Sequence, residues 1–430
     1  MNNLQIPASS SAPKNGLLRY QLLLVVLLPV LICYTLFTAI KYRSLRYFRQ
    51  RLGMVPPAKQ AVDIWIHAAS VGEVSATLPL ISAIRDKYPD KSILITTTTP
   101  TGATLFGKQN ITNAFHLFLP LDYPQAISGF IKQCRPKCLF VMETEIWPNL
   151  FRICNQENIP ICTVNGRLSQ KTLDTSGWIR TLYQSTLQNS SFILTRSDND
   201  TKAYIALGAD SSKVKTIGNI KFSANVGTPN QYRAPINRPY VLAASTHNNE
   251  EFQIANFWKQ RKLRQISNSL LMIAPRHPNR LKNILGQLKN LQFNIAVRSK
   301  QEDITDSTDL YIVDTVGELI DFMADARVVF IGGSLVPVGG HNILEPAALG
   351  KPIIFGPHME NFADEAELLT HFNAAVQIEN IEELGEKIAD TMRNPDNYTK
   401  MGLQAKHLVE QQKDTAYRYV EALAPYISHT

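Results

Sequence analysis

A strand-and-helix rhythm that occurs twice constrains the fold of this chain more than any other feature of its sequence. Short runs rich in β-branched and aromatic residues alternate with helical patterns, from "VDIWIHA" to "FILTRS" and again from "YVLAAS" to "AAVQIE". Such alternation is typical of βαβ units and of parallel sheets. The polar stretch "SANVGTPNQYRAPINRP", which carries three prolines, separates the two halves. We therefore expect an α/β chain with two Rossmann-like domains in tandem.

The length of the chain favours the same division. At 430 residues it exceeds what one hydrophobic core usually supports. We place the first domain at residues 51–222, the linker at 223–239, the second domain at 240–405 and a C-terminal helix at 406–430. Ligands of open α/β sheets bind at the carboxyl ends of the strands. We expect ligand-binding residues just after the strands, in a cleft between the two domains.

Residues 1–50 have a different character. Residues 22–40, "LLLVVLLPVLICYTLFTAI", carry no charge and match the length of about 20 residues that a bilayer-crossing helix needs. Five basic residues follow between residues 41 and 51, whereas only Lys14 and Arg19 precede the run. A cleaved signal peptide is the alternative, but its apolar core is normally shorter. We predict an uncleaved membrane anchor, with the rest of the protein held in the cytoplasm by the positive-inside bias.

Charge and cysteine content limit the partners and the compartment. The net charge of +8 suits anionic partners such as nucleic acid, phosphorylated substrates or an anionic membrane face. No histidine cluster accompanies the five cysteines, and none of them forms a paired CxxC set: Cys33, Cys134, Cys138, Cys154 and Cys162. This pattern argues against a zinc site or a disulfide framework and fits a reducing compartment.

Carboxylates follow two strands of the first half. Glu73, in "IHAASVGE", falls in the first turn of the next helix, where the helix dipole favours an ionised carboxylate able to take a proton from a hydroxyl. Acidic residues also occupy first turns for capping alone, and this alternative stays open. Glu143 and Glu145, in "FVMETEIWPNL", are so close that at least one should face the cleft. Arg167 in "TVNGRLS" and Lys221 in "TIGNIKF" are cations for an anionic substrate, or plain surface residues.

The second half carries three polar turns and one glycine-rich segment. The turns are "AASTHNNEE", "APRHPNR" with Arg276, and "VDTVGEL" with Glu318, and turn or cap chemistry explains each one singly. The segment "FIGGSLVPVGGHNILEPAALGKPIIFGP" is more specific, because its two double glycines can present backbone N–H groups to an anion. Asn342 and Glu345 lie three residues apart on the helix expected after the second pair, so they share a face suited to ribose hydroxyls. No GxGxxG or P-loop pattern is present, so dinucleotide or ATP binding gains little support.

Eight motifs in order, after an apolar anchor, resemble the bacterial 3-deoxy-D-manno-octulosonic acid (Kdo) transferases of lipopolysaccharide synthesis: "HAASVGE", "TTTTPTG", "METEIWPNL", "NGRLS", "ASTHNNEE", "PRHP", "DTVGEL" and "GGSLVPVGGHNILEPA". The resemblance covers the chain from the anchor onward. It implies a GT-B glycosyltransferase at the cytoplasmic face of the bacterial inner membrane. Such an enzyme transfers Kdo, with inversion, from CMP-Kdo to the tetraacyl, bisphosphorylated lipid A precursor. The resemblance implies no metal, no other cofactor and no nucleic-acid partner.

The same resemblance implies roles for individual residues. Glu73 would be the general base, and Glu143 and Lys221 would assist the transition state. The residues that would bind CMP are Pro275, Arg276, Val316, Gly317, Glu318, Asn342, Ile343, Leu344 and Glu345.

Two residues depart from the family pattern, and two other functions stay open. Asn249 stands where the family usually has glycine, and Ser223 where aspartate is common.

One alternative function is that of a GT-B enzyme or epimerase that acts on a UDP-sugar, although such chains generally lack the anchor followed by "SVGE" and "METE". The other is a membrane-tethered binding protein without catalysis. The number of Kdo units, the oligomeric state and whether the segment containing Pro29 fully crosses the bilayer also stay open.

Overall fold

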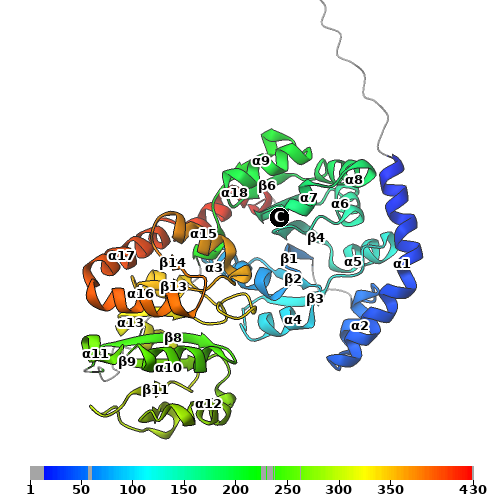
Figure 1. The fold of residues 1–430 in the computed structure, drawn as a ribbon. Helices are drawn as coiled ribbons and strands as arrows, with labels where there is room; N and C mark the ends of the chain where they lie inside the picture. Colours follow the sequence, from blue (N-terminus) through cyan, green and yellow to red (C-terminus); the bar gives the residue numbers. More distant parts are fainter. Residues whose placement is uncertain are drawn as a thin grey trace, which may run out of the picture. The chain divides into compact units, whose positions relative to one another are not determined.

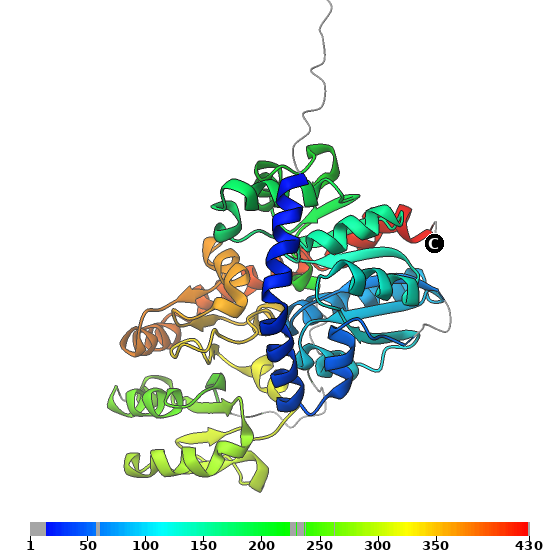
Figure 2. The same cartoon turned by 90° about the vertical axis from the view of Figure 1, so that its right-hand side faces the viewer.

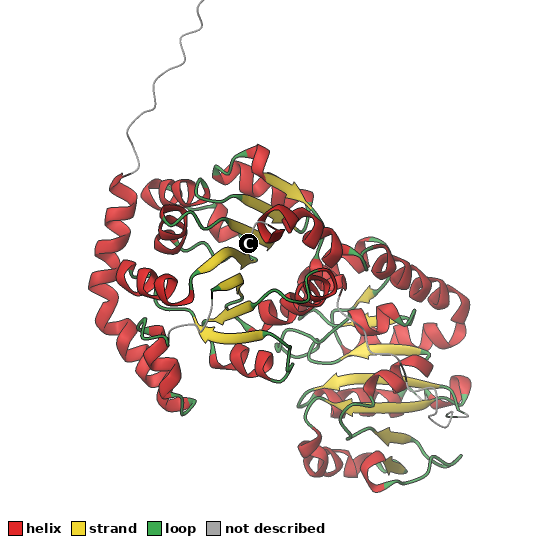
Figure 3. Ribbon diagram, turned by 180° about the vertical axis from the view of Figure 1, so that it is seen from behind, coloured by secondary structure: helices red, strands yellow, loops and turns green. Residues whose placement is uncertain are grey.

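The chain forms two compact α/β units. A computed structural model describes residues 14–56, 61–223, 229, 236, 238–261 and 263–428. Unit 1 comprises Met1–Ala224 together with Asp414–Thr430, and unit 2 comprises Asn225–Lys413 (Figure 1). Each unit is built on one seven-stranded sheet in which all neighbouring strands run parallel, with helices packed around it (Figure 3). The predicted pair of Rossmann-like domains is therefore confirmed. Most of the predicted linker, 223–239, lies outside the described residues.

The sheet of unit 1 has the order β3-β2-β1-β4-β5-β6-β7. Its strands are β1 (Val62–His67), β2 (Ile93–Thr97), β3 (Ala114–Phe118), β4 (Pro136–Met142), β5 (Ile161–Gly166), β6 (Phe192–Thr195) and β7 (Val214–Thr216). The central strands are buried along almost their whole length, as expected for a sheet covered on both faces. The strand order reverses between β1 and β4, and ligands of doubly wound sheets bind at such a reversal. The sequence did not predict β7, whose three partly exposed residues carry no strand pattern.

Helices connect the strands of unit 1, and three of them begin with proline at the first helical position. The helices are α1 (Lys14–Lys41), α2 (Leu45–Arg51), α3 (Val71–Lys87), α4 (Pro100–Gly107), α5 (Pro124–Cys134), α6 (Pro148–Gln156), α7 (Gln170–Leu173), α8 (Gly177–Leu187), α9 (Asp198–Leu207) and α18 (Thr415–Ser428), with the 3-10 turns η1 (Ser211–Lys213) and η2 (Ile220–Ser223).

The sheet of unit 2 has the order β10-β11-β9-β8-β12-β13-β14. Its strands are β8 (Tyr240–Thr246), β9 (Leu270–Pro275), β10 (Ile295–Val297), β11 (Leu310–Ile312), β12 (Val328–Ile331), β13 (Ile353–Phe355) and β14 (Val376–Gln377). Its helices are α10 (Glu250–Gln260), α11 (Arg264–Ser267), α12 (Leu281–Leu288), α13 (Leu319–Asp325), α14 (Leu344–Ala348), α15 (Ala363–His371), α16 (Ile381–Arg393) and α17 (Pro395–Gln411), with η3 (Pro278–Arg280), η4 (Lys289–Leu291), η5 (Arg298–Lys300) and η6 (Glu360–Phe362).

The C-terminal segment differs from the prediction of one helix over residues 406–430. The helical chain ends in unit 2 with α17, turns, and starts again as α18 in unit 1. Tyr419, Leu423 and Ile427 of α18 are buried in the core of unit 1. Their four-residue spacing places them on one helix face, so α18 is stabilised by the surface of unit 1. Ser223 accepts a hydrogen bond from the backbone N–H of Ala416 at 3.0 Å, which ties η2 to the start of α18.

Candidate functional site

Glu73 lies in the first turn of α3, directly after the buried strand β1, as the sequence predicts. Ser70 is the N-cap of α3, and its hydroxyl accepts a hydrogen bond from the Glu73 N–H at 3.4 Å. The Glu73 carboxylate in turn accepts hydrogen bonds from the N–H of Ala69 at 2.8 Å and from the Ser70 hydroxyl at 2.9 Å. This reciprocal arrangement is close to a capping box, so Glu73 does serve as helix-start chemistry. The cap also fixes the position of the carboxylate.

The surroundings of Glu73 make its carboxyl group unusually basic. Burial raises its pKa to about 8, and the negative charges of Glu145 and Glu143 add to the rise. The hydrogen bonds from Ala69 and Ser70 act in the opposite direction and are outweighed. A carboxyl group used only for capping would gain most by staying ionised beside the helix N-terminus. The raised pKa instead suits a group that exchanges a proton near neutral pH.

His67, for which the sequence predicted no role, is a buried partner of this acidic group. It ends β1, is fully buried, and its Nδ1 lies 2.9 Å from Oγ1 of Thr96. Its Nε2 lies 3.4 Å from Oε2 of Glu145, which also accepts a 2.8 Å hydrogen bond from the indole of Trp147. Burial of Glu145 opposes its ionisation, but the contacts with His67 and Trp147 outweigh burial and hold its pKa below the ordinary value. Glu145 is therefore a fixed negative charge whose field keeps Glu73 basic.

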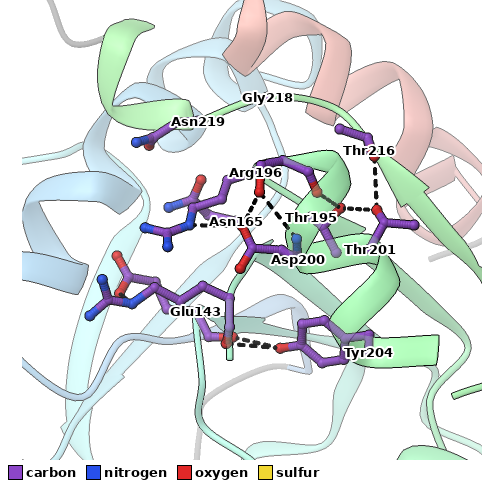
Figure 4. A network of polar contacts seen from close by, with 12 residues as sticks. Glu143, Asn165, Thr195, Arg196, Asp200, Thr201, Tyr204, Thr216, Gly218 and Asn219 are labelled. Atoms are coloured by element: carbon purple, nitrogen blue, oxygen red, sulfur yellow. Dashed lines mark hydrogen bonds and ion pairs between the residues drawn. The ribbon is translucent and has the colours of Figure 1, made fainter. Parts of the chain in front are cut away.

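Glu143 meets the two cations predicted from the neighbouring loops. Its Oε2 lies 3.1 Å from Nε of Arg167, and its Oε1 lies 3.6 Å from Nζ of Lys221. Only 7% of Glu143 is exposed, and its φ of 52° places it in the left-handed region that non-glycine residues seldom adopt. The hydroxyl of Tyr204 donates to the Glu143 carbonyl at 3.1 Å and holds this backbone (Figure 4). Such strained residues cluster at functional sites.

Asn165 fixes the loop that carries Lys221. Its Oδ1 accepts a hydrogen bond from the N–H of Ile220 at 3.1 Å, although the two residues are 55 positions apart. In the same network, Nε of Arg196 lies 3.0 Å from Oδ2 of Asp200, at the start of α9 (Figure 4). The site of unit 1 thus draws side chains from the ends of β1, β4 and β5 and from η2, and it brings Glu143, Arg167 and Lys221 together.

In unit 2, Asn342 and Glu345 are in direct contact, but the helix begins later than predicted. The amide of Asn342 donates to Oε1 of Glu345 at 2.9 Å, and its Oδ1 accepts from the N–H of Leu344 at 3.0 Å. Helix α14 begins at Leu344 with Ile343 as its N-cap, so Asn342 precedes the helix instead of sharing a helix face with Glu345. Burial raises the pKa of Glu345, while Asn342 and the charge of Arg276 oppose the rise. Arg276 therefore acts electrostatically on Glu345.

The first double glycine already holds an anion that belongs to the protein. The carboxylate of Glu250 is fully buried and accepts hydrogen bonds from the N–H groups of Gly333 at 2.7 Å, Leu335 at 3.0 Å and His247 at 2.8 Å. The expected cradle for a ligand anion at Gly333 is thus occupied by a side chain. Gly333 has a φ of +68°, and a Cβ there would lie 3.2 Å from the ring of His341. Glu250 locks the β8 and β12 loops together.

Three histidines meet at the ends of neighbouring strands: His247 after β8, His277 after β9 and His341 after β12. Nε2 of His247 lies 2.8 Å from Nε2 of His341, and the planes of the two rings are nearly parallel, at an interplanar angle of 7°. One of the two nitrogens must carry a hydrogen and the other must accept it, so the pair shares a single proton there. Burial lowers the pKa of both, that of His341 to about 4, with the charge of Arg276 contributing. His277 packs edge-on against His247.

The turn at residues 316–318 is exposed at its first two positions. Val316 is 86% exposed, and Gly317 has a φ of +94°. The carboxylate of Glu318 is paired with Arg298 at 2.6 Å. Nearby, Pro275 ends β9 and Arg276 is exposed, with its N–H bonded to the carbonyl of Thr246 at 3.0 Å.

The two departures from the family pattern have local explanations. Asn249 has a φ of +78° at the N-cap of α10, a conformation that suits glycine and that asparagine tolerates better than most residues. Ser223 uses its hydroxyl at the start of α18. Among the residues that the structure describes, no group of three or more His, Cys, Asp and Glu side chains is arranged to hold a metal ion.

The chain is similar to known proteins along most of its length. A family model described as 3-deoxy-D-manno-octulosonic-acid transferase (kdotransferase) matches residues 46–224. A 3-deoxy-D-manno-octulosonic acid transferase of Haemophilus influenzae is 33% identical over 427 residues, which cover 95% of this chain and 98% of that protein.

Solved structures share the fold at lower identity. A glycosyltransferase of Rickettsia africae has a TM-score of 0.54 at 17% identity, covering 86% of this chain and 98% of that one. The UDP-GlcNAc 2-epimerase of Neisseria meningitidis has a TM-score of 0.57 at 14% identity, covering 85% and 100%. These likenesses agree with the predicted GT-B fold class. Because the chain is 33% identical to the Haemophilus protein over nearly the full length of both, we conclude that it belongs to the family of 3-deoxy-D-manno-octulosonic acid (Kdo) transferases, which are glycosyltransferases.

Proposed function

We propose that this Kdo transferase takes Kdo from CMP-Kdo and places it on the tetraacyl, bisphosphorylated lipid A precursor, with inversion and with Glu73 as the general base. The proposal is supported best by the position of the Glu73 carboxylate, held by Ala69 and Ser70 after β1, where burial raises its pKa to about 8. A base with that pKa is suited to proton transfer near neutral pH. Once ionised, it accepts a proton more strongly than an ordinary glutamate does.

The proposed step is a single displacement. A hydroxyl oxygen of the acceptor forms a bond to carbon 2 of Kdo while its proton passes to Glu73. The bond between carbon 2 and the phosphate oxygen of CMP breaks on the opposite side, and the electron pair leaves with CMP. Attack from the face opposite the leaving group inverts the configuration at carbon 2.

Charge development in this step gives Glu143 and Lys221 their proposed roles. Carbon 2 becomes oxocarbenium-like, and the carboxylate of Glu143 is suited to stabilise positive charge there. Lys221 is suited to neutralise an acidic group of the donor. Their separation of 3.6 Å and the tie of η2 to Asn165 support preorganisation, because neither side chain needs to be ordered when substrate binds.

The donor is proposed to bind to unit 2. Arg276 is an exposed cation suited to the phosphate of CMP, with Pro275 beside it. Glu345, oriented by Asn342, is suited to accept hydrogen bonds from the ribose hydroxyls. The exposed turn at Val316 and Gly317 is suited to contact the base, and Glu318 is fixed by its ion pair with Arg298. Ile343 and Leu344 complete the turn. The proposal requires no metal and no other cofactor.

The location follows from the acceptor and from α1. Gly16–Lys41 is long and apolar enough, by length and composition alone, to cross a membrane. We place the protein at the inner membrane with both units in the cytoplasm, where a lipid acceptor with two phosphates meets a chain of net charge +8.

The test is an assay of membrane fractions with labelled Kdo, generated as CMP-Kdo in place, and the tetraacyl lipid A precursor. Mass spectrometry of the product should show the precursor with one or more Kdo units added. No product, with both substrates intact, would contradict the proposal. Binding should then be compared between CMP and UDP, because the fold is shared with a UDP-GlcNAc 2-epimerase. Preference for UDP would favour a UDP-sugar enzyme.

A further inference from the structure

Helix α1 lies against unit 1 along its whole length instead of projecting from it. Figure 2 shows the helix running across the face of unit 1. The residues that contact the unit recur about every fourth position, which places them on one helix face. The buried members of this face are Gly16, Leu24, Thr35, Thr38 and Ala39.

The N-terminal part of α1 is held by polar contacts. The hydroxyl of Tyr20 donates to Oδ2 of Asp122 at 2.9 Å, and the amide of Gln21 donates to Oδ1 of Asn149 at 2.8 Å. Asp122 is buried and also accepts the N–H groups of Asn149 and Leu150, at the start of α6. Breaking these contacts would leave buried polar groups without partners.

The same part of the helix packs closely on α8. Gly16 is buried there, and a Cβ at this position would contact the backbone of Trp178 and Leu182 at 3.6 and 3.7 Å. The carbonyl of Leu24 accepts a hydrogen bond from the hydroxyl of Tyr123, at the start of α5. Three separate segments of unit 1 therefore hold the first half of α1.

The C-terminal end of α1 is held by the same unit. Ala39 packs in a cluster with Tyr47 of α2 and Phe118 of β3, whose rings meet edge to face at 4.9 Å. Gln50 of α2 accepts the N–H of Phe118 at 2.9 Å. Both ends of α1 are thus fixed to one folded body.

The outward face of α1 is apolar, whereas the exposed face of a helix in a soluble protein is normally polar. The buried inward residues are small or polar except for Leu24, whereas the outward face is formed by large apolar residues. These exposed residues are Leu18, Leu22, Leu23, Val25, Val26, Leu27, Val30, Tyr34, Leu36, Phe37 and Ile40. A continuous apolar stripe of this length marks an interaction surface. Exposed cations stand at both ends of the stripe, Arg19 at one end and Lys41, Arg43 and Arg46 at the other, as an anionic lipid surface requires.

A helix that crosses a bilayer must place about 20 residues in hydrocarbon. For α1 these would include the positions from Tyr20 to Ala39, and each end of that stretch is held by unit 1. Asp122, in the loop before α5, and Asn149, at the start of α6, would have to enter the hydrocarbon with it. Soluble helices and loops with polar surfaces are not accommodated there.

We propose that the chain is monotopic: α1 lies in one leaflet of an anionic membrane, with its outward apolar stripe in the acyl region and both of its ends on the side of unit 1. The amphipathic placement, with one face on protein and the other in lipid, resembles that of interfacial helices. This inference does not depend on the identity of the sugar donor or acceptor.

The native Cys33 gives the first test, because it is exposed on α1 whereas the other four cysteines are buried. In opened membrane vesicles from cells producing the full chain, a membrane-impermeant maleimide should leave Cys33 unlabelled until detergent is added. Labelling of Cys33 in opened vesicles without detergent would overturn the proposal, because it would show that the stripe faces water. Recovery of the protein in the soluble fraction would overturn it as well.

The second test concerns the side on which the chain before α1 lies. In a Cys33→Ala background, Ser10→Cys precedes the helix and Lys413→Cys, at an exposed position of unit 2, is the matched control. In intact cells with a permeabilised outer membrane, neither cysteine should react with the impermeant maleimide, and both should react after lysis. A periplasmic protein with a single cysteine confirms that the reagent has entered. Reaction of Ser10→Cys, but not of Lys413→Cys, in intact cells would show a crossing helix and would refute the monotopic placement. Kdo transfer in the same membranes is measured separately, so failure of the proposed reaction is distinguishable.

Discussion

Substitution Glu73→Gln exchanges a carboxyl group for a neutral amide of nearly the same shape, so it separates the ionisation of this side chain from its packing. The amide can keep both hydrogen bonds, because its oxygen can accept from Ala69 while its nitrogen donates to the Ser70 hydroxyl. We therefore expect the variant to fold with α3 capped as in the wild type. What it loses is the ability to take up a proton.

The size of the effect on stability follows from the pKa. Folding raises the pKa of Glu73 from 4.5 to about 8, so the folded chain retains a proton that the unfolded chain releases in this range. Stability that is present below pH 4.5 is lost as the pH rises, by about 1.4 kcal/mol per pH unit, and the loss levels off above pH 8. The total is about 5 kcal/mol for this group. The glutamine amide does not titrate, so the Glu73→Gln variant should become progressively more stable than the wild type between about pH 5 and pH 8.

The activity of the wild type should rise with pH over the range in which its stability falls. Wild-type kcat/KM should rise about tenfold per pH unit up to roughly pH 8 and then level off, because only ionised Glu73 accepts the acceptor proton. Glu73→Gln should lower the rate by about 10²–10⁴-fold and leave a flat pH profile.

The assay combines thermal unfolding across pH with mass-resolved Kdo transfer at the same pH values. The control is Glu386→Gln, which removes an exposed carboxylate from α16 of unit 2 and should change neither curve. Unfolding curves of Glu73→Gln that run parallel to the wild type, together with a rate within about tenfold of it, would refute both the burial argument and the assignment of the base.

Three further substitutions test the remaining parts of the proposed site. Lys221→Met should lower kcat at least about 100-fold with CMP affinity unchanged by calorimetry, since it removes a charge aimed at the transition state, whereas the exposed Lys215→Met should not. Arg276→Ala should weaken CMP binding by roughly ten- to a hundredfold, as expected for a charge-assisted bond of about 1.5–3 kcal/mol, and unchanged affinity would remove it from the site. Glu250→Ala should lower the stability of unit 2 by about 3 kcal/mol in thermal unfolding, because three backbone N–H groups lose their acceptor; an unchanged melting temperature would argue against this role.

The alternation of strands and helices was predictable because it depends on local patterns. Buried parallel strands read as short β-branched runs, and α3 and α6 follow from the periodicity and from Pro148 at the first helical position. The position of Glu73 in a first turn followed from the same local signals. The ordered motifs then sufficed to recognise the family, which the comparison over 427 residues shows. The three-residue β7 was missed because an edge strand of that length has no period to detect.

Contacts between distant segments were decided by the tertiary structure. The contact of His67 with Glu145 joins the ends of two strands that lie side by side only after the sheet has formed. Likewise, the glycine turn at Gly333 appeared suited to a ligand anion until folding brought Glu250 to its N–H groups across 83 residues. Spacing along the chain reports which residues share a helix or strand, but not which side chain reaches a given donor.

The two ends of the chain illustrate the same limit. Apolarity and length predicted a membrane segment at residues 22–40, because hydropathy is a property of composition. Which face of that helix meets protein depends on Tyr20 and Gln21 finding partners in α6 and the loop before α5. At the other end, the sequence predicted a helix over residues 406–430, but only the core of unit 1 determined that α18 packs there, because burial depends on the surface available to receive the helix.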